Sequence, residues 1–134
     1  MIVADTNLLV ALWAGGRQAA VAEAVRRRDA RWVAPRLWRS EFRNAILGMT
    51  KARLLTSDLA LTLASDVEEA MANHEYDVVT RDVLTLALRS GCTAYDCEYV
   101  ALAHALDVPL VTFDGDVRRA FPARAVAPEI FVAD

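Results

Sequence analysis

Carboxylate side chains stand directly after two apolar segments of this sequence. Asp5 follows residues 1–4, a run too short for a helical period, and Asp114 follows residues 109–113. Such runs are typical of strands buried on both faces of a parallel sheet, and ligands bind in the crevice beyond the carboxyl ends of those strands. We therefore expect both carboxylates at one crevice, although Asp5 taken alone would more commonly cap the helix that follows it.

Two further acids are predicted to lie at the same end of the fold. Glu41 falls in the second turn of a helix expected after Pro35, beside an apolar stripe that includes Phe42. Asp96 falls in the first turn of another helix, where the helix dipole favours an anion, and Tyr99 continues the buried face of that helix. Four acids from four separate elements would then meet at one site.

Four buried like charges demand compensation, because a desolvated carboxylate without a partner shifts its pKa and becomes neutral. Mg²⁺ or Mn²⁺ would supply that compensation, since both ions prefer carboxylate and water oxygens as ligands. One or two such ions can deprotonate water and stabilise an in-line displacement at phosphorus. The acids therefore indicate metal-dependent hydrolysis of a phosphoester.

Neighbouring polar residues are predicted to orient these ligands. Thr6, Asn7 and Thr112 offer hydroxyl and amide groups that can hydrogen-bond to a carboxylate. The last motif contains two acids, of which Asp114 is the stronger metal ligand by its place at the strand end. Asp116 is a further candidate, and its role as a ligand, a water-mediated contact or a plain loop residue stays open.

The chain alternates strands with helices that are joined by short connections. This order predicts an α/β fold in three layers, with a central parallel sheet of four to five strands flanked by helices. We expect a single domain over residues 1–134. Helices are predicted over 7–14, 18–28, 36–53, 57–73, 81–89 and 97–106, with Thr93 capping the last, and strands over 1–4, 31–34, 76–79, 109–113 and 129–132.

Composition excludes several classes of protein. The 134 residues are 55% hydrophobic and contain no repeat or low-complexity tract, which excludes a disordered chain. No apolar run is long enough to span a bilayer and no signal peptide is recognisable, so we expect a cytoplasmic protein that does not act at a membrane. Cys92 and Cys97 fit neither a disulfide framework nor a zinc spacing.

Taken together, the motifs resemble those of the PIN-domain family, and in order, spacing and length they resemble the VapC-type toxin ribonucleases. The resemblance covers essentially the whole chain, and each motif alone is weak. One departure is Asn7, where Ser or Thr is also common in the family. Four segments carry the resemblance: Asp5-Thr6-Asn7, residues 38–45 around Glu41, residues 95–103 around Asp96, and Thr112-Phe113-Asp114.

This resemblance implies a Mg²⁺- or Mn²⁺-dependent endoribonuclease with a five-stranded parallel sheet, usually dimeric. It implies as partners an RNA substrate and a cognate antitoxin, a segment of which inserts into the acidic groove. A homodimer is also suggested by Trp13, Leu37 and Trp38, which add more large apolar side chains than one thin sheet can cover.

Charge is distributed unevenly, although the net charge is only −3. Residues 1–53 carry ten basic and four acidic residues, a balance of +6, whereas residues 54–134 carry five basic and fourteen acidic residues, a balance of −9. Arginine suits phosphate recognition because its planar fork matches phosphate oxygens. Arg39 and Arg43 flank Glu41 and are the candidates for RNA contact, with simple salt bridges as the other open role.

Two alternative functions remain. A phosphohydrolase of small phosphoesters, of the haloacid dehalogenase type, needs a second Asp two residues after Asp5, and Asn7 stands there instead. The second alternative is a catalytically silent PIN-like interaction module, which does not need the four acids. All four acids are present, so the sequence gives no sign that catalytic residues have been lost.

Overall fold

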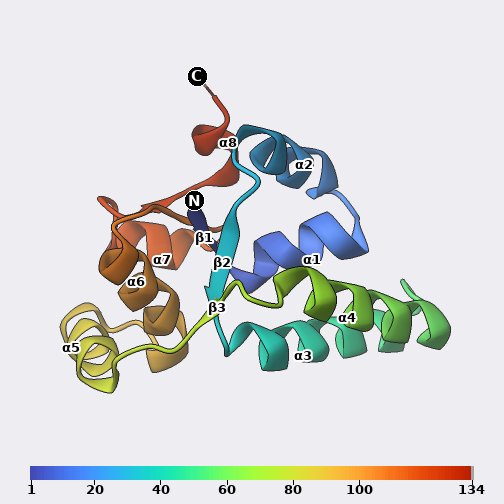
Figure 1. Ribbon diagram of the computed structural model, residues 1–134, viewed down its shortest axis with the longest axis horizontal. Coiled ribbons are helices and arrows are strands. Elements are labelled where there is room, and N and C mark those ends of the chain that lie inside the picture. Colours follow the sequence, from blue (N-terminus) through green and yellow to red (C-terminus); the bar gives the residue numbers. More distant parts are fainter. Residues whose placement is uncertain (134) are drawn as a thin grey trace.

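Five parallel strands form the centre of the computed structural model, which describes residues 1–133 (Figure 1). Their order across the sheet is β3-β2-β1-β4-β5, so the chain proceeds from β1 in one direction and later continues on its other side. The α/β architecture predicted from the sequence is confirmed. The strands are β1 (Ile2–Ala4), β2 (Trp32–Pro35), β3 (Glu75–Tyr76), β4 (Leu110–Val111) and β5 (Ala125–Val126).

The register of the sheet explains the continuous apolar runs. Val3 of β1 pairs with Val33 on one side and with Leu110 on the other, and every residue of β1 and β2 is buried. A parallel strand covered on both faces has no polar side, so its sequence does not alternate. Because β1 and β4 are neighbours and parallel, the residues that follow them lie together at one edge of the sheet.

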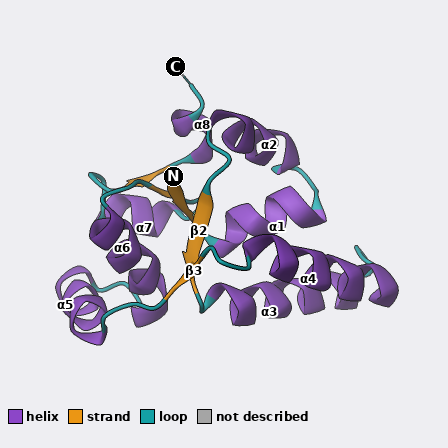
Figure 2. Cartoon of the chain, in the orientation of Figure 1, coloured by secondary structure: helices purple, strands orange, loops and turns teal. Residues whose placement is uncertain are grey.

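Two groups of helices flank the sheet (Figure 2). The first group is α1 to α4, which pack on one another; in the second, α6 contacts β1, β2 and β4 and carries α5. This division follows from the strand order, because right-handed crossovers that run in opposite directions put their helices on opposite faces. The helices are α1 (Thr6–Ala14), α2 (Ala19–Arg28), α3 (Trp38–Lys51), α4 (Ser57–Met71), α5 (Thr80–Ser90), α6 (Ala94–Leu106), α7 (Gly115–Ala120) and α8 (Pro128–Phe131).

Local sequence sets several helix ends. The Thr56 hydroxyl accepts a hydrogen bond from the N–H of Leu59 at the start of α4, and the Thr93 hydroxyl accepts one from the N–H of Asp96 at the start of α6, at 3.0 Å. Each satisfies a backbone donor that the first helical turn leaves without a partner. At the C-terminus of α5, Gly91 takes a left-handed conformation (φ 75°) that favours glycine. The left-handed Gly91 and the Thr93 cap together fix where α6 begins, and this places Asp96 in its first turn.

The strand predicted over residues 129–132 is wrong. β5 lies earlier in the chain, where Ala125 pairs with Leu110. Residues 128–131 form α8 instead, because Pro128 has a fixed φ and no N–H and therefore suits the first turn of a helix. This helix lies against α2, and the Arg28 guanidinium lies 5.5 Å from the centre of the Phe131 ring.

Two smaller expectations also need correction. The third strand is Glu75–Tyr76 and not residues 76–79, and the helix α7 was not predicted. Trp38, expected at a dimer contact, is only 1% exposed and stacks edge-on against Phe42 in the core. The Trp38 side chain is therefore buried by contacts within its own chain and is not available to a second copy.

Within residues 1–133, no single helix is long and apolar enough to cross a membrane. The pair α1 and α2 reaches the required length and composition only jointly, across a bend of 107°.

Candidate active site

Asp5 follows β1 and occupies the N-cap position of α1, but its side chain does not cap that helix. Its Oδ2 instead accepts a 2.6 Å hydrogen bond from the hydroxyl of Thr112, which follows β4 and is fully buried. The Asn7 amide reaches both, with Nδ2 3.5 Å from Asp5 Oδ2 and 3.3 Å from Thr112 Oγ1. Asn7 Oδ1 accepts from the N–H of Phe113 at 3.2 Å. The ends of β1 and β4 are thus joined around one carboxylate.

A second carboxylate, that of Glu41 on α3, belongs to a hydrogen-bonded cluster beside Asp5. The Tyr99 hydroxyl donates to Glu41 Oε1 at 2.6 Å. Thr6 Oγ1 lies 2.6 Å from the Tyr99 hydroxyl oxygen and 3.1 Å from the same Glu41 oxygen. Both hydroxyls therefore converge on Oε1, which fixes the carboxylate and leaves Oε2 without a hydrogen bond from any residue in 1–133.

The remaining acids come from α6 and from the start of α7. Asp96 lies in the first turn of α6. Asp114 caps α7, because its Oδ1 accepts from the N–H groups of Asp116 and Val117 at 2.9 and 3.3 Å. The N–H of Asp114 in turn donates to Thr112 Oγ1 at 3.0 Å. The same threonine hydroxyl thus connects the Asp5 carboxylate with the backbone of Asp114.

Electrostatics show that these groups influence one another. The pKa of Asp5 is raised to about 6, chiefly by burial and also by the charges of Glu41 and Asp96, against the lowering effect of the Thr112 hydrogen bond. Burial also raises the pKa of Asp96, to which the charges of Asp114 and Asp116 add. All four predicted acids therefore lie within electrostatic range as one group.

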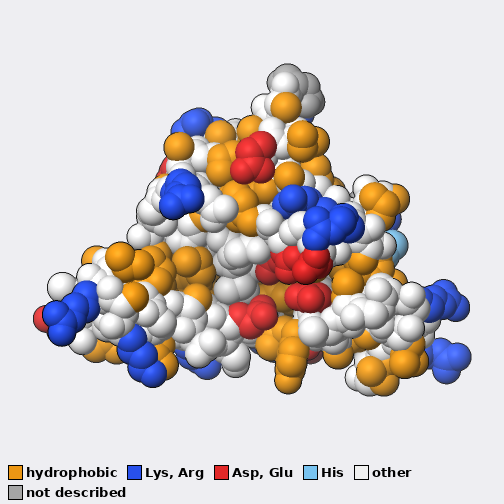
Figure 3. Space-filling view, turned by 180° about the vertical axis from the view of Figure 1, so that it is seen from behind, with side chains coloured by type: hydrophobic (Ala, Val, Ile, Leu, Met, Phe, Trp, Pro, Cys, Tyr) orange, Lys and Arg blue, Asp and Glu red, His pale blue; other side chains and the backbone are white. Residues whose placement is uncertain are grey.

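No cation within the described part of the chain, residues 1–133, compensates this group. Among residues 1–133 none of Asp5, Glu41, Asp96 and Asp114 forms an ion pair, although acids elsewhere on the surface commonly do. Figure 3 shows acidic side chains gathered in the middle of one face of the molecule, with basic side chains beside them. Asp116 is different, because it pairs with Arg119.

The chemistry of these donors fits Mg²⁺ or Mn²⁺. The group presents carboxylate, hydroxyl and amide oxygens and no thiol or imidazole, which is the ligand set of hard divalent cations. Within the described residues no three acids, histidines or cysteines already stand close enough to enclose an ion. Mg²⁺ keeps several of its waters when bound, so one or two carboxylates suffice for each ion. Asp5, Glu41, Asp96 and Asp114 are the residues that would hold it.

Sequence reasoning missed two members of the site. Tyr99 was expected only to continue a buried face, but its hydroxyl positions Glu41. Glu98 is half-buried, and burial and the Glu41 charge both raise the pKa of its carboxyl. The available signal was an acid and a phenol two and three residues after Asp96, on the helix that carries Asp96 into the site.

Arg39 and Arg43 both form ion pairs in the structure. Arg39 binds Glu75 through two hydrogen bonds of 2.7 Å, and the indole N–H of Trp38 donates to the same carboxylate at 3.0 Å. Arg43 binds Glu68 at 3.0 Å. Of the two roles open on the sequence, the salt bridge is the one seen here.

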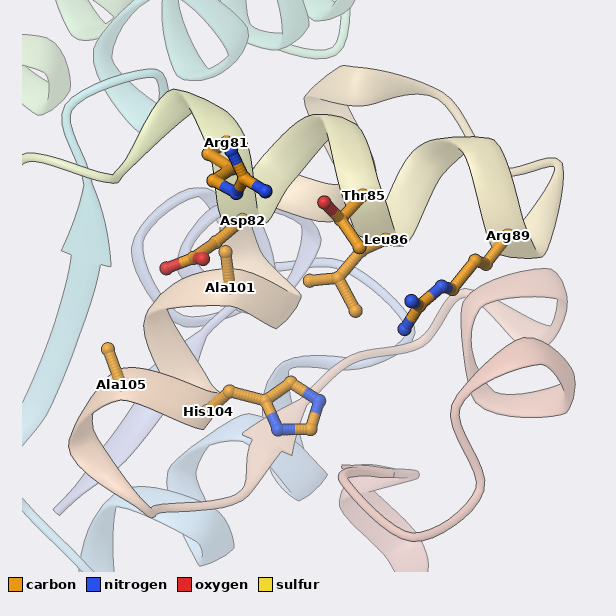
Figure 4. Close-up of a pocket in the computed structure, with 8 residues that line it drawn as sticks. All are labelled: Arg81, Asp82, Thr85, Leu86, Arg89, Ala101, His104 and Ala105. Carbon is orange, nitrogen blue, oxygen red and sulfur yellow. The ribbon is translucent and has the colours of Figure 1, made fainter.

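A separate hollow of about 610 Å³ lies between α5 and α6, away from the four acids. Figure 4 shows Arg81, Arg89 and His104 at this hollow, together with Asp82. It offers positive charge from Arg81 and Arg89 and contains none of the four acids. It is therefore a second, chemically different surface.

Comparison with known proteins agrees with this fold. The family model described as PIN domain matches residues 2–121. Ribonuclease VapC3 from Pyrobaculum aerophilum is 35% identical over 86 residues, which are 62% of this chain and 66% of that protein. The chain thus matches just under two thirds of that relative's length. The crystal structure of PAE2754, also from Pyrobaculum aerophilum, has the same fold, with a TM-score of 0.73 at 23% identity over 98% of this chain and 93% of that one.

The match spans all four acids and four of the five strands, β1 to β4. The resemblance inferred from the sequence motifs is confirmed, and this chain belongs to the PIN domain family.

Proposed function

We propose that this protein is a Mg²⁺- or Mn²⁺-dependent endoribonuclease. One observation carries the proposal: four carboxylates from four elements gather at the carboxyl ends of β1 and β4, and no cation in residues 1–133 pairs with them. A fold that collects uncompensated charge in this way lowers its own stability, which is typical of a site built for an absent positive partner. The name of the relative, Ribonuclease VapC3, supports RNA as the substrate.

In this proposal the residues of the chain have distinct roles. Divalent ions supply activation of water and stabilise charge on the phosphate. Asp5, Glu41, Asp96 and Asp114 hold those ions, and Thr112 fixes the orientation of Asp5. Tyr99 and Thr6 fix Glu41 by binding one of its two oxygens. The remaining carboxylate oxygens are then presented in defined directions.

A small-phosphoester hydrolase is the weaker alternative. An acid–base residue two positions after Asp5 would have to exchange protons, but Asn7 is an amide that both donates to Asp5 and accepts from the backbone. Its hydrogen bonds orient the strand ends and leave it no proton to transfer.

We further propose that the protein is the cytoplasmic toxin of a toxin–antitoxin pair and forms a homodimer. The name of the relative, Ribonuclease VapC3, and the four acids that no cation in residues 1–133 compensates support an inhibitory protein partner. Exposed leucines on α3 and α4, Leu47 at 50% and Leu61 at 72%, give an apolar surface that suits a second copy of the chain. This surface replaces buried Trp38 as the proposed dimer contact.

The experiment for the nuclease proposal uses purified protein without antitoxin, incubated with single-stranded and hairpin RNA. Cleavage is expected with Mg²⁺ or Mn²⁺ and none with EDTA. Asp96→Asn should be inactive, whereas Asp66→Asn, on the exposed side of α4, should keep wild-type activity. Para-nitrophenyl phosphate serves as the small-phosphoester probe. Undiminished RNA cleavage in EDTA, or turnover of that probe without RNA cleavage, would refute the proposal.

A further inference from the structure

A hollow of about 530 Å³ lies between α7 and the turn that joins α5 to α6. Asp96, one of the four acids, forms part of its wall, so the hollow adjoins the proposed metal site. Most of the residues that line it are uncharged. The residues that line it are Ser90, Gly91, Cys92, Thr93, Asp96, Asp116, Arg119 and Ala120.

Arg119 is the cation of this hollow. Its guanidinium pairs with Asp116, one turn earlier on α7, and both side chains are largely exposed, at 74% and 85%. The guanidinium also lies over Gly115, where an added Cβ would stand 3.1 Å from Arg119 Nη1. The absence of a side chain at Gly115 therefore lets Arg119 fold back toward the acidic site.

Other arginines near the site are engaged in ways that keep them in place. Arg39 is held by both oxygens of Glu75, whose side chain is only 6% exposed. Arg118 donates to the backbone carbonyl of Thr112 at 3.1 Å. The Arg119–Asp116 pair, in contrast, is largely exposed to water, where an ion pair contributes little to stability. Arg119 can therefore exchange Asp116 for another anion at small energetic cost.

We propose that this hollow binds the nucleotide next to the scissile phosphate, and that Arg119 leaves Asp116 to bind that nucleotide's phosphate. The inference rests on the nuclease function proposed above and adds a substrate subsite to it. A phosphate carries oxygens in the geometry that a guanidinium fork matches, so it competes well against a solvated carboxylate. Ser90, Cys92 and Thr93 provide the small, neutral surface against which the base and sugar lie.

Asp116 acquires a defined role in this arrangement. In the free protein it holds Arg119 at the rim, and on RNA binding it is released. Because Asp116 competes with RNA for the same guanidinium, its removal should strengthen binding, whereas removal of a true metal ligand should not. Removal of Asp116 and removal of Arg119, which lie one turn apart on α7, should therefore change RNA affinity in opposite directions.

The experiment measures affinity for a fluorescent single-stranded RNA across a salt series. The protein carries Asp5→Asn to prevent cleavage, and EDTA is present throughout. Arg119→Ala should weaken binding several-fold and reduce the slope of log affinity against log salt by about 0.7, the value for one phosphate contact with a single strand. Asp116→Ala should tighten binding, and this gain should vanish in the Arg119→Ala, Asp116→Ala double variant. Arg119→Lys should retain part of the salt slope.

Arg17→Ala is the matched control, because Arg17 is an exposed arginine in the α1–α2 connection and its loss changes the net charge equally. Thermal melts confirm that each variant is folded. If wild-type protein cleaves RNA but Arg119→Ala keeps the affinity, the slope and kcat/KM, the subsite is refuted while the nuclease function stands. Loss of affinity in Arg81→Ala and Arg89→Ala with none in Arg119→Ala would place the RNA in the α5–α6 hollow instead. If the wild type neither cleaves nor binds RNA, both proposals fail.

Discussion

Replacing Asp5 by Asn should stabilise the metal-free protein while it abolishes cleavage. The substitution keeps the side-chain volume and removes a negative charge from a group in which burial and the charges of Glu41 and Asp96 already raise the pKa of Asp5. The change from 3.8 to about 6 corresponds to about 3 kcal/mol of destabilisation of the charged form, at about 1.4 kcal/mol per unit. The new amide N–H₂ needs an acceptor, so we expect a net gain of about 1–3 kcal/mol at pH 7.

The pH dependence of this gain has a definite sign. A carboxyl whose pKa is higher in the folded state binds its proton more tightly there, so wild-type protein suffers no disadvantage below about pH 4. The disadvantage grows as pH rises from 3.8 toward 6 and is constant above that. The difference between the Asn variant and wild type should therefore be near zero at pH 4 and complete by pH 7.

Thermal unfolding in EDTA at several pH values measures this difference. For 134 residues a gain of about 1–3 kcal/mol corresponds to a rise in Tm of about 4–10 °C, from about 2 cal/mol/K of unfolding entropy per residue. Asp66→Asn is the control and should leave Tm unchanged. Added Mn²⁺ should raise the Tm of wild type and not that of Asp5→Asn. A lower Tm for the variant at pH 7, or a gain that is the same at pH 4, would show that Asp5 stabilises the fold and that the reasoning is wrong.

Three further predictions concern the surroundings of the site. Tyr99→Phe removes the hydroxyl that positions Glu41, so cleavage should fall at least tenfold and more Mn²⁺ should be needed for half-maximal rate; unchanged metal dependence in a cleavage titration would contradict that role. Arg39→Ala should lower the free energy of unfolding by about 2 kcal/mol at pH 7, because Glu75 loses the two hydrogen bonds that lower its pKa. This loss should shrink as pH falls below 4.5, where the unfolded carboxyl is protonated, and urea melts at pH 3.5 and 7 check it. Leu61→Glu should convert the dimer into a monomer in sedimentation at micromolar concentration, and a dimer that persists would place the interface elsewhere.

The fold and the four acids could be predicted because they depend on local patterns. An apolar run that ends on a carboxylate gave Asp5 and Asp114 their places at the strand ends. Helical periodicity indicated that Glu41 faces inward, and the threonine cap before Asp96 set the first turn of α6. Each of these patterns spans only a few residues. The parallel arrangement of the strands then brings the four acids to one edge of the sheet.

Other features depend on contacts that no local pattern contains. Arg39 is paired with Glu75, 36 residues away, so the sequence shows the charge but not its neutralisation. Tyr99 was identifiable as buried, but the direction of its hydroxyl follows from how α6 packs beside α3. The composition of residues 129–132 is typical of a strand. In the structure, however, Ala125–Val126 forms the fifth strand and Pro128 begins a helix.

The adjacency of β1 and β4 also determines when the site can exist during synthesis. Asp5 precedes Thr112, whose hydroxyl holds it, by 107 residues. Until the segment from Thr112 to Asp114 has emerged from the ribosome, β1 has no β4 beside it and only part of the carboxylate group is present. Every shorter nascent chain that ends before Asp114 therefore carries Asp5 without the hydrogen bond and the neighbouring acid that complete the group.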